Sequence, residues 1–137
     1  MALTWRRIKP LKSENALADF ENRYGFSIGN ELKDFIINHN GGRPIPKTMI
    51  TDNGEEYEVK CFLSFNPDDT DSVYKVIDFF TDNYSNSLLP FAKDSADNYF
   101  CLKDGKIILW FQDMTDTPIC DSFSKFLELL AQQTTDR

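Results

Sequence analysis

The first apolar pattern along the chain predicts a helix over residues 13–24. Leu17, Phe20 and Tyr24 recur at helical spacing and fall on one face. Ser13 can cap the beginning of this helix, and Gly25 ends it because glycine readily takes the left-handed conformation of a helix terminus.

A second helix is predicted over residues 30–40, with its polar positions facing away from an apolar stripe. The stripe has the i, i+3, i+4, i+7 spacing and consists of Leu32, Phe35, Ile36 and His39. The run Asn40-Gly41-Gly42 ends the helix, and Pro44 and Pro46 prevent it from restarting.

The pattern then changes from helical to extended spacing. The segments IPKTMI (45–50) and YEVKCFLSF (57–65) flank TDNGEE, in which Asn53-Gly54 favours a hairpin turn. In the second segment alternate positions are apolar, which predicts a strand with one buried face and one mixed face.

The remaining pattern predicts a helix, three strands and a final helix. The helix covers residues 71–84, with Thr70 or Asp71 as its cap. Short strands follow at 88–92, 98–103 and 106–112, and Asp104-Gly105 forms a tight turn between the last two. Asp121 or Ser122 caps the final helix, and the polar residues 131–137 are expected to fray.

This order predicts one α+β domain over residues 1–137, with a mainly antiparallel sheet of about five strands packed against about four helices. Hairpin connections outnumber strand-helix-strand crossovers, which is why an antiparallel sheet is favoured. A chain of 137 residues can bury a substantial core without disulfides or metals. No apolar run is long enough to span a bilayer, and the beginning of the chain does not resemble a secretory signal.

Charge is distributed unevenly along the chain. The net charge is −7, but residues 1–12 form a basic arm with a charge of +4, so the remainder carries −11. An acidic body of this kind repels phosphate backbones, which disfavours nucleic-acid binding and favours a basic partner. Trp5, within the arm, could anchor the arm to the body or face a partner.

The sequence shows no complete set of catalytic or metal-binding residues. Cys61, Cys101 and Cys120 are widely spaced, which predicts free thiols in a reducing cytoplasm and neither a disulfide framework nor a zinc site. His39 is the single histidine, and its place on an apolar helical stripe favours a structural role over a role as a catalytic base. No cofactor is expected.

The clustered acids do not match a known metal loop. Asp68, Asp69 and Asp71 lack the spacing, the glycine and the final glutamate of an EF-hand. Asp94 and Asp97 supply only two carboxylates in one loop, and Asp94 and Asn98 are instead expected to hydrogen-bond the backbone of their own turn.

Three segments together resemble the SUKH superfamily, which includes the yeast cell-wall assembly regulators and many bacterial immunity proteins. They are LADFENRYGFSIGNELKDFIINHNGGRP (17–44), LLPFAKDSADNYFCL (88–102), and KIILWFQDM followed by ICDSFSKFLELL. The family framework carried by these segments comprises Gly41, Gly42, Pro44, Pro90, Phe91, Asp94 and Asn98.

Two positions depart from the family pattern. Gly29 stands where many members have proline, so that Asn30 is expected to cap the second helix. Asp97 stands where many members have glycine, and an aspartate tolerates a positive φ there better than most residues do.

The resemblance implies an immunity protein that binds and neutralises a cognate protein toxin, possibly a basic nuclease, without catalysis. Acidic side chains could occupy a basic toxin cleft, and the candidate contacts are Asp52, Glu55, Glu56, Asp68, Asp69 and Asp71. The alternatives are a regulatory adaptor like the yeast regulators, a small hydrolase that uses His39 or an acidic cluster, and an acidic surface that serves only solubility.

Overall fold

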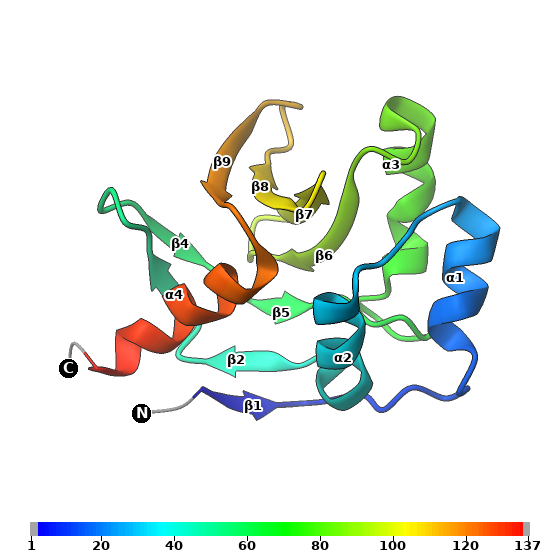
Figure 1. Cartoon of the computed structure of the whole chain (residues 1–137), viewed down its shortest axis with the longest axis horizontal. Coiled ribbons are helices and arrows are strands. Elements are labelled where there is room, and N and C mark those ends of the chain that lie inside the picture. Colours follow the sequence, from blue (N-terminus) through cyan, green and yellow to red (C-terminus); the bar gives the residue numbers. More distant parts are fainter. Residues whose placement is uncertain (1–2, 136–137) are drawn as a thin grey trace.

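A five-stranded antiparallel sheet forms the centre of the protein. The computed structural model describes residues 3–135. The strands β5 (Cys61–Phe62), β6 (Leu89–Lys93), β7 (Tyr99–Lys103), β8 (Lys106–Trp110) and β9 (Asp116–Cys120) are hydrogen-bonded in this order (Figure 1). The Asp104-Gly105 turn joins β7 to β8, and both residues have positive φ (53° and 80°), as the predicted tight hairpin requires.

Two smaller antiparallel pairs flank the sheet. β1 (Thr4–Arg6) pairs with β2 (Arg43–Ile45), and β3 (Thr48–Ile50) pairs with β4 (Glu56–Glu58). The β1–β2 pair continues towards the central sheet, because the Phe62 N–H donates to the Gly42 carbonyl over 2.9 Å.

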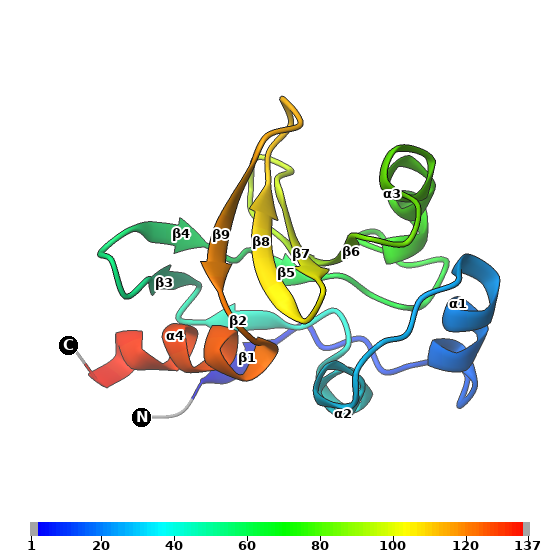
Figure 2. The same cartoon turned by 45° about the horizontal axis from the view of Figure 1, so that its top comes forward.

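Within residues 3–135, four α-helices complete the α+β fold that the pattern predicts. α1 (Ala16–Tyr24), α2 (Asn30–His39) and α3 (Ile77–Tyr84) gather at one end of the molecule, whereas α4 (Phe123–Thr135) lies beside the β3–β4 hairpin at the other end (Figures 1 and 2). α4 packs against β3 and β9, and α3 packs against β6. Within the described residues, no helix is both long and apolar enough to cross a membrane.

Aromatic side chains dominate the core between these layers. Six phenylalanines are at most 1% exposed, namely Phe20, Phe65, Phe80, Phe91, Phe100 and Phe126. Phe91 and Phe126 meet edge to face with ring centroids 5.3 Å apart, and Phe100 meets Phe126 at 5.2 Å. Burial of such rings is the main favourable term in folding, and their edge-to-face contacts add to it.

The single strand predicted over residues 57–65 is wrong. Its first part forms β4 and pairs with β3, whereas Cys61 and Phe62 form β5 and pair with β6. All residues from Cys61 to Asn66 are buried, so the expected alternation of a buried and a mixed face does not extend beyond Val59. The cause is non-local, since helices and the β1–β2 pair cover this segment.

The predicted helix over residues 71–84 is also shorter than expected. A 3₁₀ helix, η1 (Val73–Lys75), precedes α3, and Ser72 caps it by accepting a hydrogen bond from the Tyr74 N–H over 3.1 Å. Thr70 and Asp71 therefore do not cap this segment. A single residue, Val76, separates η1 from α3.

The predicted cap is present at the beginning of the first helix but not of the second. α1 begins at Ala16, and the Ser13 hydroxyl accepts from the Asn15 N–H over 3.1 Å, although Asn15 at the N-cap itself makes no side-chain capping bond. Asn30 is already helical, and the N-cap position of α2 belongs to Gly29, which has no side chain to cap with. For α4 the prediction holds, because the Ser122 hydroxyl accepts from the Lys125 N–H over 3.1 Å.

The ends of the chain contain more regular structure than their composition predicts. Residues 4–6 of the basic arm form β1, and α4 extends to Thr135, into the segment expected to fray. The edge strand β9 was not predicted either, because Pro118 interrupts its apolar pattern. An edge strand tolerates a proline, which lacks the N–H that an inner strand needs.

Candidate partner-binding surface

Asn40 is the buried polar centre of the framework. Its side chain is at the end of α2, and the residue is 1% exposed. Its Oδ1 accepts from the Phe65 N–H (2.8 Å), while its Nδ2 donates to the Lys9 carbonyl (2.7 Å) and to the Ser64 hydroxyl (3.0 Å). One side chain thus joins the N-terminal arm, α2 and the segment after β5.

The two glycines after Asn40 allow the chain to turn closely beneath the arm. Gly41 has φ +69°. A Cβ on Gly42 would lie 2.9 Å from the His39 carbonyl oxygen and 3.2 Å from Cε3 of Trp5, which is too close for any side chain. The ring of Trp5 meets Phe35 at 5.1 Å, so that Trp5 anchors the arm to the body, one of the two roles predicted for it.

The turn between β6 and β7 holds itself together through Asp94. Its Oδ1 accepts from the N–H groups of Ala96 and Asn98, each over 2.9 Å, and its Oδ2 accepts from the Asn98 side chain over 3.0 Å. This confirms that Asp94 hydrogen-bonds the backbone of its own turn. The Asn98 side chain does not, because it donates to Asp94 and its Oδ1 accepts from the Gln112 N–H over 3.1 Å, which links the turn to the β8–β9 connection. Asp97 has φ +62°, which is the backbone geometry that would favour glycine there.

The same turn is tied to the sheet by an ion-pair group around Lys93. The Lys93 Nζ lies 2.5 Å from Asp97 Oδ1 and 3.6 Å from Asp71 Oδ1, and Asp71 also lies 4.0 Å from Arg43. Burial lowers the pKa of Lys93, but the hydrogen bond and the charge of Asp97 outweigh it, so the net shift is upwards. The Asp71 carboxylate therefore pairs with cations of this chain, Lys93 and Arg43.

Of the predicted loop acids, Asp69 also has internal partners. Its Oδ2 accepts from the Ser64 hydroxyl (2.6 Å) and from the Asn66 side chain (3.0 Å), and Oδ1 lies 3.7 Å from Lys12 Nζ. Burial raises the pKa of Asp69, but these hydrogen bonds and the nearby lysines lower it by more. Asp68, by contrast, is exposed.

The predicted hairpin acids project into solvent. Asp52 and Glu55, on the connection between β3 and β4, and Glu56, the first residue of β4, are all exposed, and Asp52 lies 3.4 Å from Lys125 of α4. Figures 1 and 2 place this hairpin and the β5–η1 loop at different ends of the molecule. The six predicted acids thus form two separate groups, and within the loop group only Asp68 is fully exposed.

His39 contacts the rings of Trp5 and Phe35, and no ion pair within the described part of the chain includes it. Its Nδ1 is 3.0 Å from the Phe35 carbonyl oxygen, and its ring stacks on that of Phe35 at a centroid distance of 4.6 Å. These contacts match the structural role predicted for this residue.

The thiols are not activated for nucleophilic attack. Burial, followed by the charge of Asp71, raises the pKa of Cys61 to about 11, and burial raises that of Cys120 to about 11. Burial also raises the pKa of Cys101. Among residues 3–135, no three His, Cys, Asp or Glu side chains are grouped closely enough to hold a metal ion.

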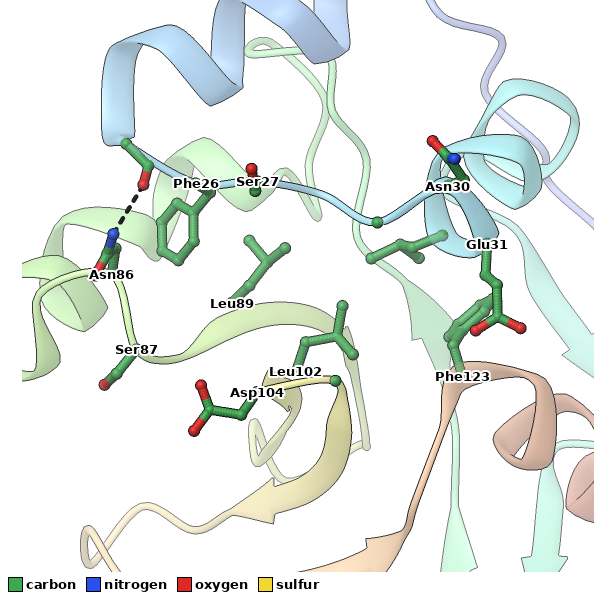
Figure 3. A pocket seen from close by; sticks show the side chains of 14 residues that line it. Phe26, Ser27, Asn30, Glu31, Asn86, Ser87, Leu89, Leu102, Asp104 and Phe123 are labelled. Atoms are coloured by element: carbon green, nitrogen blue, oxygen red, sulfur yellow. Dashed lines mark hydrogen bonds between the residues drawn. The ribbon is translucent and has the colours of Figure 1, made fainter.

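A cleft of about 610 Å³ opens between the α1–α2 loop and the β7–β8 hairpin (Figure 3). Phe26 and Ser27 lie along one side and Asp104 along the other, with Leu89 and Leu102 between them. At one end, the Asn86 side chain donates to the Gly25 carbonyl over 2.9 Å. At the opposite end, Glu31 accepts a hydrogen bond from the Ser124 hydroxyl beside Phe123.

A second, smaller hollow of about 280 Å³ is lined mainly by apolar side chains of α3 and the sheet. Phe79 (41% exposed) and Met114 (47% exposed) stand at its edge, and Trp110 is part of its wall. The rings of Phe79 and Trp110 meet at 5.4 Å. Exposed Phe and Met side chains around a hollow are features of protein-interaction surfaces.

Sequence reasoning did not identify either concave site. Glu31 and Asp104 are far apart in the chain, and nothing local shows that they share a cleft. Phe79 did leave a signal, because it lies outside the apolar stripe of its helix and its large apolar side chain is therefore directed to solvent.

The fold and its buried framework define a small α+β domain in which the strongest motifs maintain structure. The model of the SMI1/KNR4 family (SUKH-1) matches residues 12–129. The chain therefore belongs to this family, which confirms the resemblance carried by its three motifs.

One curated relative is a prophage protein. The SPbeta prophage-derived uncharacterized protein YokK of Bacillus subtilis (strain 168) is 23% identical over 154 aligned residues, which cover 93% of this chain and 79% of that protein. No solved structure matches the chain.

Proposed function

We propose that this protein is an immunity protein, which neutralises a cognate bacterial toxin by forming a stoichiometric complex with it in the cytoplasm. Membership of the SUKH-1 family is the observation that carries the proposal. The similarity to a prophage-derived protein agrees with it, since it relates the chain to a mobile genetic element.

The distribution of polar groups supports binding rather than catalysis. The side chains of the motif residues Asn40 and Asp94 form hydrogen bonds with backbone groups of this chain and are therefore not available to a substrate. His39 and the cysteines have structural surroundings. A surface that varies without disturbing this framework suits a family whose members recognise different toxins.

Charge determines the kind of toxin that we propose. A nuclease toxin carries a basic cleft for phosphates, and the body of this chain carries −11. Opposite charges steer the two proteins together and position them. The exposed hairpin acids Asp52, Glu55 and Glu56 and the loop acid Asp68 are the proposed contacts, whereas Asp69 and Asp71 would shape the loop from within.

Co-expression tests this proposal. A candidate toxin domain, sought among the neighbouring genes, is expressed in a sensitive host with and without the protein, and growth is measured. We expect the wild-type protein to restore growth, and a tagged copy to recover the toxin domain. Toxicity that persists despite soluble protein would contradict the proposal, and recovery of several unrelated partners would favour a regulatory adaptor instead.

Charge reversal then tests the proposed surface. Glu55→Lys with Glu56→Lys should weaken protection, whereas the matched reversal Glu14→Lys with Asp34→Lys, at two other exposed acids, should not. Equal protection by both double variants would remove the hairpin acids from the interface.

A further inference from the structure

The cleft between the α1–α2 loop and the β7–β8 hairpin combines an apolar floor with two separated carboxylates. Leu89 is buried and Leu102 is half-buried, and both side chains lie in the middle of the cleft in Figure 3. The charged residues that line the cleft are Glu31 and Asp104, and both are acidic. Its volume of about 610 Å³ falls within the range of about 300–1,000 Å³ that is usual for binding clefts.

This arrangement selects one kind of side chain. An arginine has an apolar stem and flat guanidinium faces that pack on apolar groups, and its N–H groups form a planar fork that matches carboxylates. A lysine would offer one compact, strongly hydrated charge, and an aliphatic side chain would leave both carboxylates without a new partner. An anion would be repelled by both acids, although the uncapped beginning of α2 faces the same cleft.

The Glu31 carboxylate and the backbone of Asp104 are held in place before any ligand arrives. Glu31 accepts a hydrogen bond from Ser124, which fixes the first turn of α2 against the beginning of α4. Asp104 is the first residue of a tight turn with positive φ at both central positions, so its position is set by the β7–β8 hairpin. Groups that are already ordered lose less entropy on binding.

We propose that this cleft is the docking site for an arginine side chain of the basic protein partner. The inference rests on the proposed function for the identity of that partner as a toxin. It adds a contact that lies apart from the β3–β4 hairpin acids (Figure 2). The arginine would lay its stem on Leu102 and place its guanidinium group against Asp104 or Glu31.

The first test uses a probe in place of the toxin. The ¹⁵N-labelled protein is titrated with N-acetyl-L-arginine amide, with N-acetyl-L-leucine amide and with inorganic phosphate, and amide shifts are followed by NMR. We expect saturable shifts at Glu31, Leu102 and Asp104 with the arginine probe alone. Equal or stronger shifts at these residues with leucine amide or phosphate, or arginine shifts at other residues only, would overturn the proposal.

A double variant that neutralises both carboxylates makes the test specific. Glu31→Gln keeps an acceptor for the Ser124 hydroxyl, and Asp104→Asn places Asn-Gly in the turn, the pair that such hairpins prefer. We expect arginine affinity to fall by about two- to fivefold, as the loss of an exposed ion pair would give. The control, Glu14→Gln with Asp34→Asn, removes the same charge at two exposed acids outside the cleft and should bind arginine as the wild type does. Unchanged arginine affinity in the Glu31/Asp104 variant would overturn the proposal.

A second test separates the cleft from the proposed function. If the wild-type chain protects against the toxin and the Glu31→Gln/Asp104→Asn variant protects equally well, the toxin does not use this cleft. If the wild type fails to protect while the arginine titration succeeds, the proposed function fails and the arginine site remains. Self-association that the variant abolishes, measured by analytical ultracentrifugation, would assign the cleft to the basic arm of a second copy and overturn the proposal.

Discussion

At the scale of single residues, the strongest family motifs contribute to stability. Asn40 satisfies groups from three segments at once, and Asp94 satisfies its own turn. Buried polar groups of this kind are costly when one partner is removed, because the others lose their hydrogen bonds without regaining water.

Replacing Asn40 with alanine should therefore destabilise the protein severely. The Phe65 N–H and the Lys9 carbonyl would lose their partner, and we expect a loss of about 2–4 kcal/mol in the free energy of unfolding. Urea denaturation measures it. The control Asn38→Ala, at an exposed position of the same helix, should change stability by less than about 0.5 kcal/mol. A loss below about 1 kcal/mol for Asn40→Ala would show that water replaces these bonds.

The same substitution should have opposite effects at two glycines. Gly42→Ser places a Cβ against the His39 carbonyl and Trp5, and should cost roughly 1–3 kcal/mol. Gly29→Ser meets open space and supplies the missing N-cap of α2, and should stabilise by a few tenths of a kcal/mol. Thermal denaturation of both variants is the measurement, and a stable Gly42→Ser variant would refute the close packing of the arm.

Asp69 should contribute to acid sensitivity. Its pKa is held below its ordinary value of about 3.9, so its stabilisation is present above that pH and is lost as the pH falls through the lowered pKa. Asp69→Asn keeps an acceptor but cannot titrate. Free energies of unfolding measured between pH 2 and 7 should therefore fall less steeply below pH 4 in Asp69→Asn than in the wild type. Parallel curves would contradict the lowered pKa.

At the scale of elements, local sequence signals predicted the hairpins and helices that are determined by residues close together in the chain. Asp104 and Gly105 have the positive φ angles that the tight turn between β7 and β8 requires. Ser122 caps α4 by accepting a hydrogen bond from the N–H of Lys125, three residues further along. These elements were predicted at nearly their observed positions.

Elements that depend on distant partners were missed or divided wrongly. β1 exists because residues 4–6 meet residues 43–45, and β5 separates from β4 because it pairs with β6. The candidate site follows the same rule. Exposed acids can be identified from the charges in the sequence. The cleft lined by both Glu31 and Asp104 can be recognised only from the tertiary fold.

The β8–β9 connection shows a local conflict between backbone and side chain. Met114 has φ +69°, a conformation that costs a residue with a Cβ about 1 kcal/mol or more, and its side chain borders the apolar hollow beside Phe79. Met114→Asn should raise stability by about 1 kcal/mol in thermal denaturation, since asparagine tolerates this conformation. Met114→Ala keeps the strain and should give no gain. Equal stability of the two variants would contradict the strain.

At the scale of the whole molecule, the buried structural framework is distinct from the exposed acids that we propose as an interaction surface. The buried motifs and the Lys93 ion-pair group hold the arm, the loop and the sheet together. The exposed hairpin acids and the acidic cleft remain available for a partner. A family with such a division can change its partner without changing its fold.

The most direct test of this account is a titration of toxin activity with purified protein. Increasing amounts of the chain are added to a fixed amount of the candidate toxin domain from the co-expression test, and the residual activity is measured. The account predicts a linear fall to zero at one equivalent, without dependence on incubation time beyond complex formation. Full activity at excess protein, or progressive inactivation by far less than one equivalent, would contradict neutralisation by stoichiometric binding.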